Sequence, residues 1–549
     1  MKVRIDRKAR KFILSILTPV ISLNSIHFTS LKQPNLPTVV NFFAKPSQTN
    51  WIVFCLITCL IIGRWLIVSE GEYDEDESTW IASALTVLQS SEKWWTLFNY
   101  SDSRPLTVLP LVAAGLLGIK QGYLMAKLIG VLFWAGSVFF LFKAFSVYIK
   151  PNKALWYILP LALYFGTTWN PGFVSYNSEH FCIFLLTLGL WLYCKLEKTG
   201  HLNAWETCLL GFSLGLLPFA KFQAIPLGLV TAGFALGFFI YQRQWRYVAL
   251  LTAGGIFPTL LVNIFYFLHN DINSFWQDYF WNLFFYSYTT TFSKVPLSER
   301  FNLGRGLHFI FYSKHVALYF LGQFTLIVGG LMSLIMFSRK QTNTPFRLIT
   351  FGFLYLLAAI YAILQSGNMF MHYLLFLVVP LLFLTFVVVE FLSTNPTFGV
   401  RWLLLFAGLQ SIANLLSYQH IYHRQPESSI TEALQKHQQK GDKLVLWGWA
   451  DRFFLSTGMP QGIRTAHTFN AYLPGPHQPY RLQQVIKDME DNRPALFVDI
   501  AVQHLSSQCD TTYRHYRFPA LKTYISQHYQ LVQTVDSVLI YRRRASTSK

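Results

Sequence analysis

The sequence predicts an all-α polytopic membrane protein that carries a small α/β domain at its C-terminal end. The 549-residue chain is 53% hydrophobic and only 13% charged, about half the charged fraction of a soluble domain. Apolar runs recur up to residue 418, and shorter strand-like and helix-like segments follow. The net charge of +19 comes from short basic clusters scattered between the apolar runs. This distribution is typical of membrane topology and argues against nucleic-acid binding.

Residues 1–50 predict a basic cytoplasmic segment ahead of the first membrane helix. The charged start "MKVRIDRKARK" is followed by the apolar stretch "FILSILTPVISL". A helix of this length reaches about 18 Å, which is short of the roughly 30 Å of membrane hydrocarbon. Because a small-residue cleavage site does not follow, we interpret the stretch as an interfacial helix rather than a cleaved leader.

Eleven apolar segments are predicted to span the membrane. They are 51–68, 123–142, 154–169, 180–194, 205–219, 222–240, 247–268, 315–337, 348–365, 373–394 and 402–418. The run "PLTVLPLVAAGLLG" at 105–118 is of marginal length for a span and of a length common for a re-entrant or interfacial helix. If it crossed the membrane, the basic loop "KAFSVYIKPNK" would lie outside, against the charge rule below.

The charges of the loops set the predicted orientation. Five short loops, 143–154, 195–204, 241–247, 338–347 and 395–401, hold eleven cations in about 46 residues, whereas the opposite loops hold eight in about 120. The positive-inside rule places the first set and the N-terminus in the cytoplasm. The loops 69–122, 170–179, 269–314 and 366–372 and everything after residue 418 are then outside.

The expected domains are therefore the basic segment 1–50, a transmembrane domain at 51–418 and an extracytoplasmic α/β domain at 419–549. In the last domain, residues 443–449, 494–500 and 537–543 predict strands. The stretches "YRLQQVIKDMEDN" and "FPALKTYISQHY" predict helices between them.

The stretch "EGEYDEDEST" at 70–79 places six carboxylates directly after the first apolar segment. A solubilising outer loop would explain such a cluster. Apolar residues, however, recur behind it at helical spacing: Trp80, Ala84, Val87 and Leu88. This pattern predicts that Asp76 and Glu77 open an amphipathic helix that lies flat at the membrane interface.

The pattern "DEST-W-x-x-A", followed about 25 residues later by "SRPL", resembles the first external loop of a known enzyme family. The family is the polyprenyl-phosphate-sugar-dependent membrane glycosyltransferases of GT-C fold, which include the protein O-mannosyltransferases and the lipid A aminoarabinose transferase. Further stretches match it in the same order, over most of residues 51–470. They are "SYNSEHFCIFLLTLGLWLY", "LGFSLGLLPFAKFQAIPL", "NMFMHYLLFLVVPLL" and "LVLWGWADRFFLSTGMP".

The resemblance implies an inverting glycosyltransferase in a bacterial inner membrane. Such an enzyme moves a sugar from a polyprenyl-phosphate donor to an acceptor hydroxyl on the outer face. This chain departs from the family pattern at Arg104-Pro105, where a doubled proline is usual, and at Glu179, where Asp is commoner. The pairs Asp74-Glu75 and Asp76-Glu77 compete for one role, and the spacing to Trp80 favours the second pair.

The chemistry of sugar transfer assigns the candidate site residues. A carboxylate, Asp76 or Glu77, would act as the base on the acceptor hydroxyl. Cations would neutralise the departing phosphate: Lys221 first, then Arg104 and Lys127, although a lysine at the interface can also simply snorkel. The helix-terminal His372 and Tyr373 would line the donor site, unless their role is structural.

A divalent cation is possible, and no other cofactor is expected. Glu179, with His180, could join Asp76 around the ion, although so few carboxylates are a poor metal signature. Two other functions stay open: a transporter or flippase for lipid-linked glycans, and a glycan polymerase or ligase. Transporters usually show repeats and helices broken at the midplane, and polymerases several external arginines, where the long loop offers Arg300 and Arg305. The sequence identifies neither the donor sugar nor the acceptor, which is a glycan, a lipid or a protein.

Overall fold

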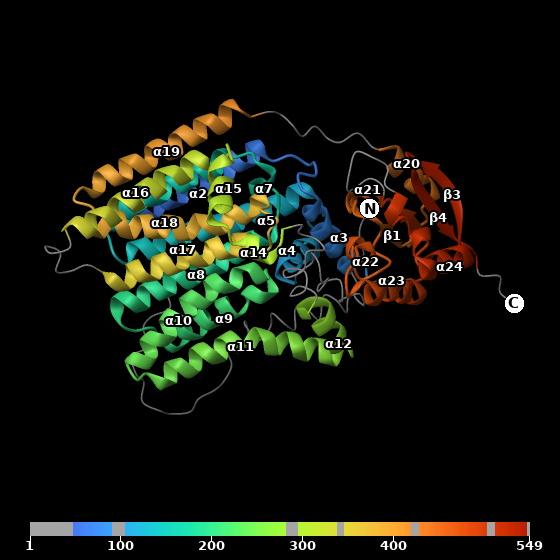
Figure 1. Ribbon diagram of the computed structural model, residues 1–549, viewed down its shortest axis with the longest axis horizontal. Coiled ribbons are helices and arrows are strands. Elements are labelled where there is room, and N and C mark those ends of the chain that lie inside the picture. Colours follow the sequence, from blue (N-terminus) through green and yellow to red (C-terminus); the bar gives the residue numbers. More distant parts are fainter. Residues whose placement is uncertain are drawn as a thin grey trace.

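The computed structural model describes residues 48–90, 105–281, 295–337, 345–418, 428–501 and 511–545. It consists of a helical bundle with a smaller α/β domain at one end, so that the long axis of the molecule runs from the bundle to the domain (Figure 1). Residues 1–47 of the predicted basic segment lie outside the described residues.

Each of the eleven segments predicted to span the membrane falls on one helix. These helices are α2 (Gln48–Ile67), α5 (Tyr123–Ser146), α6 (Pro151–Thr167), α8 (Ser178–Thr199), α9 (Ala204–Gly215), α10 (Ile225–Tyr241), α11 (Trp245–Leu268), α16 (Ala317–Phe337), α17 (Phe346–Leu364), α18 (Leu375–Phe391) and α19 (Pro396–Leu416). Among the described residues, seven helices are long and apolar enough to cross a membrane: α5, α8, α10, α11, α17, α18 and α19. The protein is thus a multi-pass membrane protein, and the crossing of the other four helices stays a prediction.

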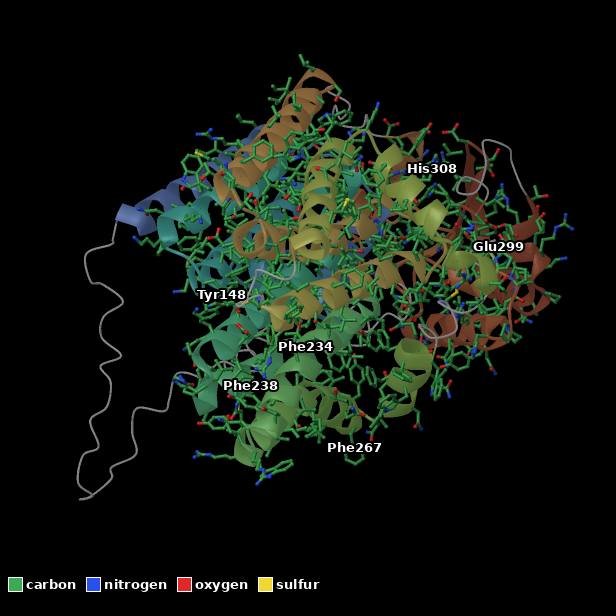
Figure 2. The ribbon with its side chains drawn as sticks, turned by 60° about the vertical axis from the view of Figure 1, so that its left-hand side comes forward. Tyr148, Phe234, Phe238, Phe267, Glu299 and His308 are labelled. Carbon is green, nitrogen blue, oxygen red and sulfur yellow. The ribbon has the colours of Figure 1, made fainter. Side chains whose placement is uncertain are left out.

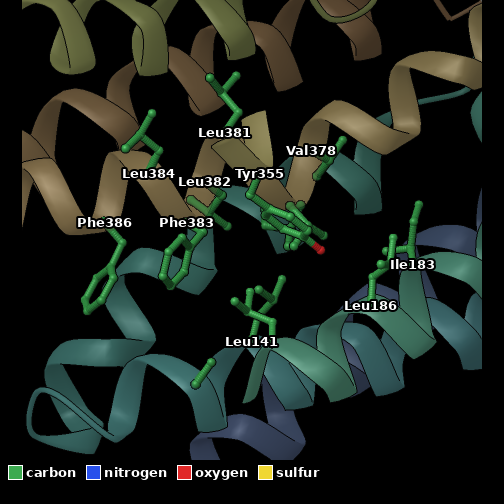
Figure 3. Close-up of a cluster of buried hydrophobic side chains, with 14 of the residues drawn as sticks. Leu141, Ile183, Leu186, Tyr355, Val378, Leu381, Leu382, Phe383, Leu384 and Phe386 are labelled. Carbon is green, nitrogen blue, oxygen red and sulfur yellow. The ribbon is translucent and has the colours of Figure 1, made fainter. Parts of the chain in front are cut away.

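Helix α18 forms the centre of the bundle. All of its residues from Leu375 to Val389 are buried, as expected of a helix that is apolar on every side. Its side chains meet Leu141 of α5, Leu186 of α8 and Tyr355 of α17 in one apolar core (Figure 3). The peripheral helices instead expose large apolar side chains, such as Ile264 of α11 and Leu416 of α19, and this surface suits contact with lipid.

Short helices gather at the end of the bundle that faces the domain (Figure 1). They are α3 (Glu75–Gln89), α4 (Pro105–Leu116), α7 (Pro171–Val174), α12 (Ile272–Ser274) with the following π-helix Phe275–Trp281, α14 (Leu297–Arg300) and α15 (Leu303–Tyr312). Glu299 and His308 lie on this side, whereas Tyr148 and Phe238 lie on the side away from the domain (Figure 2). Loops that the charge rule assigns to opposite membrane faces therefore occur at opposite ends of the bundle.

The C-terminal domain contains a four-stranded sheet in the order β1-β2-β4-β3. Strands β1 (Leu444–Trp447) and β2 (Leu496–Asp499) are parallel, and β4 (Val538–Arg543) pairs antiparallel with β2 and with β3 (Tyr529–Val535). The helices are α20 (Ser429–His437), α21 (Arg452–Thr457), α22 (Phe469–Tyr472), α23 (Gln478–Asn492) and α24 (Pro519–His528), with 3-10 turns at Thr511–Tyr513 and His515–Arg517. Apolar layers cover both faces of the sheet.

The three predicted strands are present, and β3 was not predicted. Its signal was the pair Asp536-Ser537, whose φ angles of 48° and 66° form the two-residue turn that joins β3 to β4. Hairpin turns with positive φ at both central residues favour Asp in the first position but usually Gly in the second. Because Ser stands in the second position, the pattern was hard to recognise.

Candidate active site at the end of the bundle that faces the domain

Helix α3 carries the acidic cluster, and its first turn is fixed by capping. Asp74 is the N-cap residue, and its carboxylate accepts the backbone N–H of Asp76 at 3.0 Å. Glu75, Asp76 and Glu77 occupy the first turn, where negative side chains are stabilised by the helix dipole. The helix thus begins one residue before the predicted start. It is buried along most of its length, because the C-terminal domain covers the face that an interfacial helix would leave to water.

Glu77 is fully buried against α5. Its Oε2 lies 3.2 Å from Nζ of Lys127, and its Oε1 accepts the backbone N–H of Tyr176 at 2.9 Å. Lys127 also donates to the carbonyl of Gly71 at 2.5 Å and lies 3.7 Å from the ring centroid of Tyr73. Glu77 and Lys127 therefore tie α3, the acidic loop and the bundle together, and both have structural partners rather than a free approach to substrate.

Burial raises the pKa of the Glu77 carboxyl to about 7, although the charge of Lys127 opposes the shift. Since this folded-state pKa lies above the ordinary value of 4.5, the stability that the group contributes is complete below pH 4.5 and is lost as pH rises through about 7. The interval corresponds to roughly 3 kcal/mol. We expect the difference in Tm between the wild type and Glu77→Gln to fall as pH rises through this interval.

The measurement is a set of thermal unfolding curves of the purified full-length protein at several pH values. Glu70→Gln is the matched control, because Glu70 is an exposed carboxylate of the same loop, and its difference curve should be flat. A Tm difference for Glu77→Gln that stays constant or grows with pH would contradict the assignment.

A second cluster joins four predicted residues from distant parts of the chain. Glu179, at the start of α8, forms a buried ion pair with Lys221. His372 Nε2 lies 3.9 Å from the same carboxylate oxygen, and Lys221 Nζ lies 4.9 Å from the ring centroid of Tyr373. All four residues are less than a tenth exposed. The sequence-based expectation that these residues meet on one side of the membrane is consistent with this geometry.

Local structure explains how these side chains reach one another. Lys221 has an extended backbone between the 3-10 turns Leu217–Phe219 and Phe222–Ala224. This break between α9 and α10 allows its side chain to reach Glu179 at the start of α8. His372 and Tyr373 lie in the 3-10 turn Met371–Leu374 that leads into α18. The proposed partner His180 instead takes part in the cap of α8, where its Nδ1 accepts the backbone N–H of Asn177 at 3.2 Å.

Asp76 lies in the first turn of α3, next to Glu77 in the chain. It is half-buried and close enough to Tyr373 for its charge to act on the phenol, and Asp74 acts on His372 in the same way. Glu75 instead faces the C-terminal domain, where burial and the nearby charges of Glu72, Asp451 and Asp74 raise its pKa to about 7. Asp76 is therefore the acid of the first turn that is best placed beside the Glu179 cluster.

Two sequence expectations have no further support here. Arg104, proposed as a phosphate ligand, lies outside the described residues. In the part of the chain that the structure describes, no group of three or more His, Cys, Asp or Glu side chains could hold a metal ion.

Comparison with known proteins identifies the fold. Neither a family model nor a curated protein matches the sequence. Among solved structures, ArnT from Cupriavidus metallidurans matches in two forms, bound to undecaprenyl phosphate and apo. The identities are 12% and 13%, each match covers 91% of this chain and 99% or 98% of ArnT, and both TM-scores are 0.51.

The chain has the GT-C fold of ArnT. The resemblance drawn from the loop motifs is thereby confirmed at the level of the fold, across both the bundle and the C-terminal domain. At this level of identity the likeness does not extend to substrate.

Proposed function

We propose that this protein is a glycosyltransferase that moves a sugar from a polyprenyl-phosphate carrier to an acceptor hydroxyl at the outer membrane face. The observation that carries the proposal is the gathering of Glu179, Lys221, His372 and Tyr373 into one buried cluster beside Asp76. A bundle end with a carboxylate next to a held cation suits a reaction that takes up a proton and releases a phosphate.

Asp76 is the proposed general base. Its carboxylate takes the proton of the acceptor hydroxyl while the acceptor oxygen forms a bond to the anomeric carbon of the donor sugar. The bond between that carbon and the phosphate oxygen breaks, and its electron pair stays on the polyprenyl phosphate. A single displacement of this kind inverts the configuration of the sugar.

Lys221 is the proposed phosphate ligand. An ammonium has three N–H donors, and one of them serves Glu179, so that the ion pair fixes the position of the group while it can still donate to a phosphate. His372 and Tyr373 flank it and would hydrogen-bond the phosphate or the sugar. Arg104, which follows the acidic helix in sequence, is the second proposed cation. The fold match supports a polyprenyl phosphate as the ligand because one of the matched ArnT structures is bound to undecaprenyl phosphate.

The test uses purified full-length protein in proteoliposomes with undecaprenyl phosphate that carries a labelled hexose, pentose or aminopentose. A bacterial membrane extract supplies glycan, lipid and protein acceptors. We expect at least one donor to release undecaprenyl phosphate and to give a labelled product of inverted configuration. If every donor stays intact, the proposal is wrong. If the donors stay intact but one of them moves between leaflets, the protein is a flippase instead.

A further inference from the structure

Helix α3 packs between the helical bundle and the C-terminal domain. Trp80, Ile81, Ala84 and Val87 pack with α4, α5 and the π-helix in one apolar cluster. Ala82 belongs to the apolar core of the C-terminal domain. The domain is therefore part of the packing of the helix that carries the proposed base.

Small polar side chains make the contacts on the domain face. Gln461 donates its backbone N–H to Thr86 Oγ1 at 3.0 Å and its side-chain N–H to Ser83 Oγ at 3.4 Å. Gln89 donates to the carbonyl of Gly458 at 2.9 Å. The residues of α3 involved, together with Thr79 described next, recur three or four positions apart and so form one stripe of the helix.

Asp451 lies at the end of this stripe nearest the acidic turn. It is 1% exposed, and its Oδ2 accepts the hydroxyl of Thr79 at 2.5 Å and contacts Nδ1 of His467 at 3.0 Å. Thr79 Oγ1 is also 3.3 Å from the carbonyl of Glu75. Asp451 thus binds the helix one turn after Asp76, through a hydroxyl that reaches back to the first turn.

We propose that Asp451 is a positioning residue, through which the C-terminal domain fixes the first turn of α3 and so the direction of the Asp76 carboxylate. This inference rests on the proposed function for its effect on rate, but its structural part does not. A buried carboxylate without partners is costly, so Asp451 should keep its contact with Thr79 and hold α3 in one orientation.

A second contact keeps the domain in place when Asp451 is changed. Arg464 forms two hydrogen bonds of 2.9 Å with Asp488 of its own domain and one of 2.9 Å with Asp278 of the π-helix. This bidentate arrangement is geometrically specific. Loss of the Asp451 contact should therefore loosen α3 locally while the domain stays attached to the bundle.

The experiment compares hydrogen exchange of α3 in the full-length protein for Asp451→Ala, Asp451→Asn and Thr79→Val. Asp491→Ala is the matched control, because Asp491 is an exposed carboxylate of the same domain. We expect Asp451→Ala and Thr79→Val to raise exchange in residues 75–89 by about 10-fold, with β1 and β2 unchanged. Asp451→Asn, which keeps an oxygen acceptor for Thr79, should restore most of the protection.

The second measurement is the steady-state kinetics of transfer with a donor that is active in the proteoliposome test. Asp451→Ala and Thr79→Val should lower kcat by about 10-fold and leave KM for the donor unchanged, and the double variant should be no worse than either single one. Unchanged exchange in α3, or equal increases in α3 and the sheet, would overturn the inference. If the wild type shows no transfer at all, the proposed function fails, while the exchange data still decide whether Asp451 positions the helix.

Discussion

Replacing Asp76 with asparagine is expected to lower the rate of sugar transfer by about 10²–10⁴-fold, which is the usual contribution of a general base. The substitution keeps the size of the side chain and removes its ability to take a proton. Asp76 is half-buried at the start of α3, so the fold should tolerate the change. KM for the polyprenyl-phosphate donor should stay nearly constant, because the base acts on the acceptor.

The matched comparison is the Glu77→Gln variant, which distinguishes loss of the base from loss of stability. Glu77 is buried against Lys127 and the backbone of Tyr176, and we expect its loss to act mainly through stability. The measurement is the initial rate of undecaprenyl-phosphate release, with Glu70→Gln as a control for the charge of the loop. Wild-type rates for Asp76→Asn would show that another group is the base, and a larger kinetic loss in Glu77→Gln at equal stability would assign the role to Glu77.

Much of the fold could be predicted from the sequence because the membrane imposes length and composition on each helix. The run that became α18 is apolar at nearly every position, and only a helix surrounded by others can be so. Loop charge then separated the ends of the bundle. The strand β3 was missed because only Tyr529 among its residues is buried, so it lacks the apolar pattern that marks a buried strand.

The site was predictable by residue type and less so by role. Glu179, Lys221 and His372 came into consideration through the stretches that resemble the family. Lys221 and His372 also stand at the end of an apolar run, where polar side chains are costly without partners. The sequence could not show which of Asp76 and Glu77 points toward Lys127. Adjacent helical residues point about 100° apart, so only one of the two can pair with Lys127. The contact of Asp451 with Thr79 joins residues 372 positions apart. Nothing in the sequence around either residue predicts this contact.

The Glu179–Lys221 pair should show the strongest non-additivity in the molecule. Glu179→Gln or Lys221→Met alone leaves one charge in a buried site, which typically costs 3–5 kcal/mol. The double variant removes both charges, so its Tm should lie above the value expected from the two single losses. As a control, Lys153→Met and Glu390→Gln break a pair in which Lys153 is 41% exposed, and an exposed pair typically contributes at most about 1 kcal/mol.

Binding of undecaprenyl phosphate separates the role of this pair in the fold from its role in function. If Lys221 holds only Glu179, the double variant should bind the lipid phosphate as the wild type does, because the neutral pair needs no counter-ion. If Lys221 also holds the phosphate, the double variant should recover stability and still bind at least about 10-fold more weakly, as expected for the loss of a charged hydrogen bond. We expect the second result. The extended backbone of Lys221 and the ring of Tyr373 place the ammonium of Lys221 at the same end of the bundle as Asp76. That is the position in which it could hold the phosphate as well as Glu179.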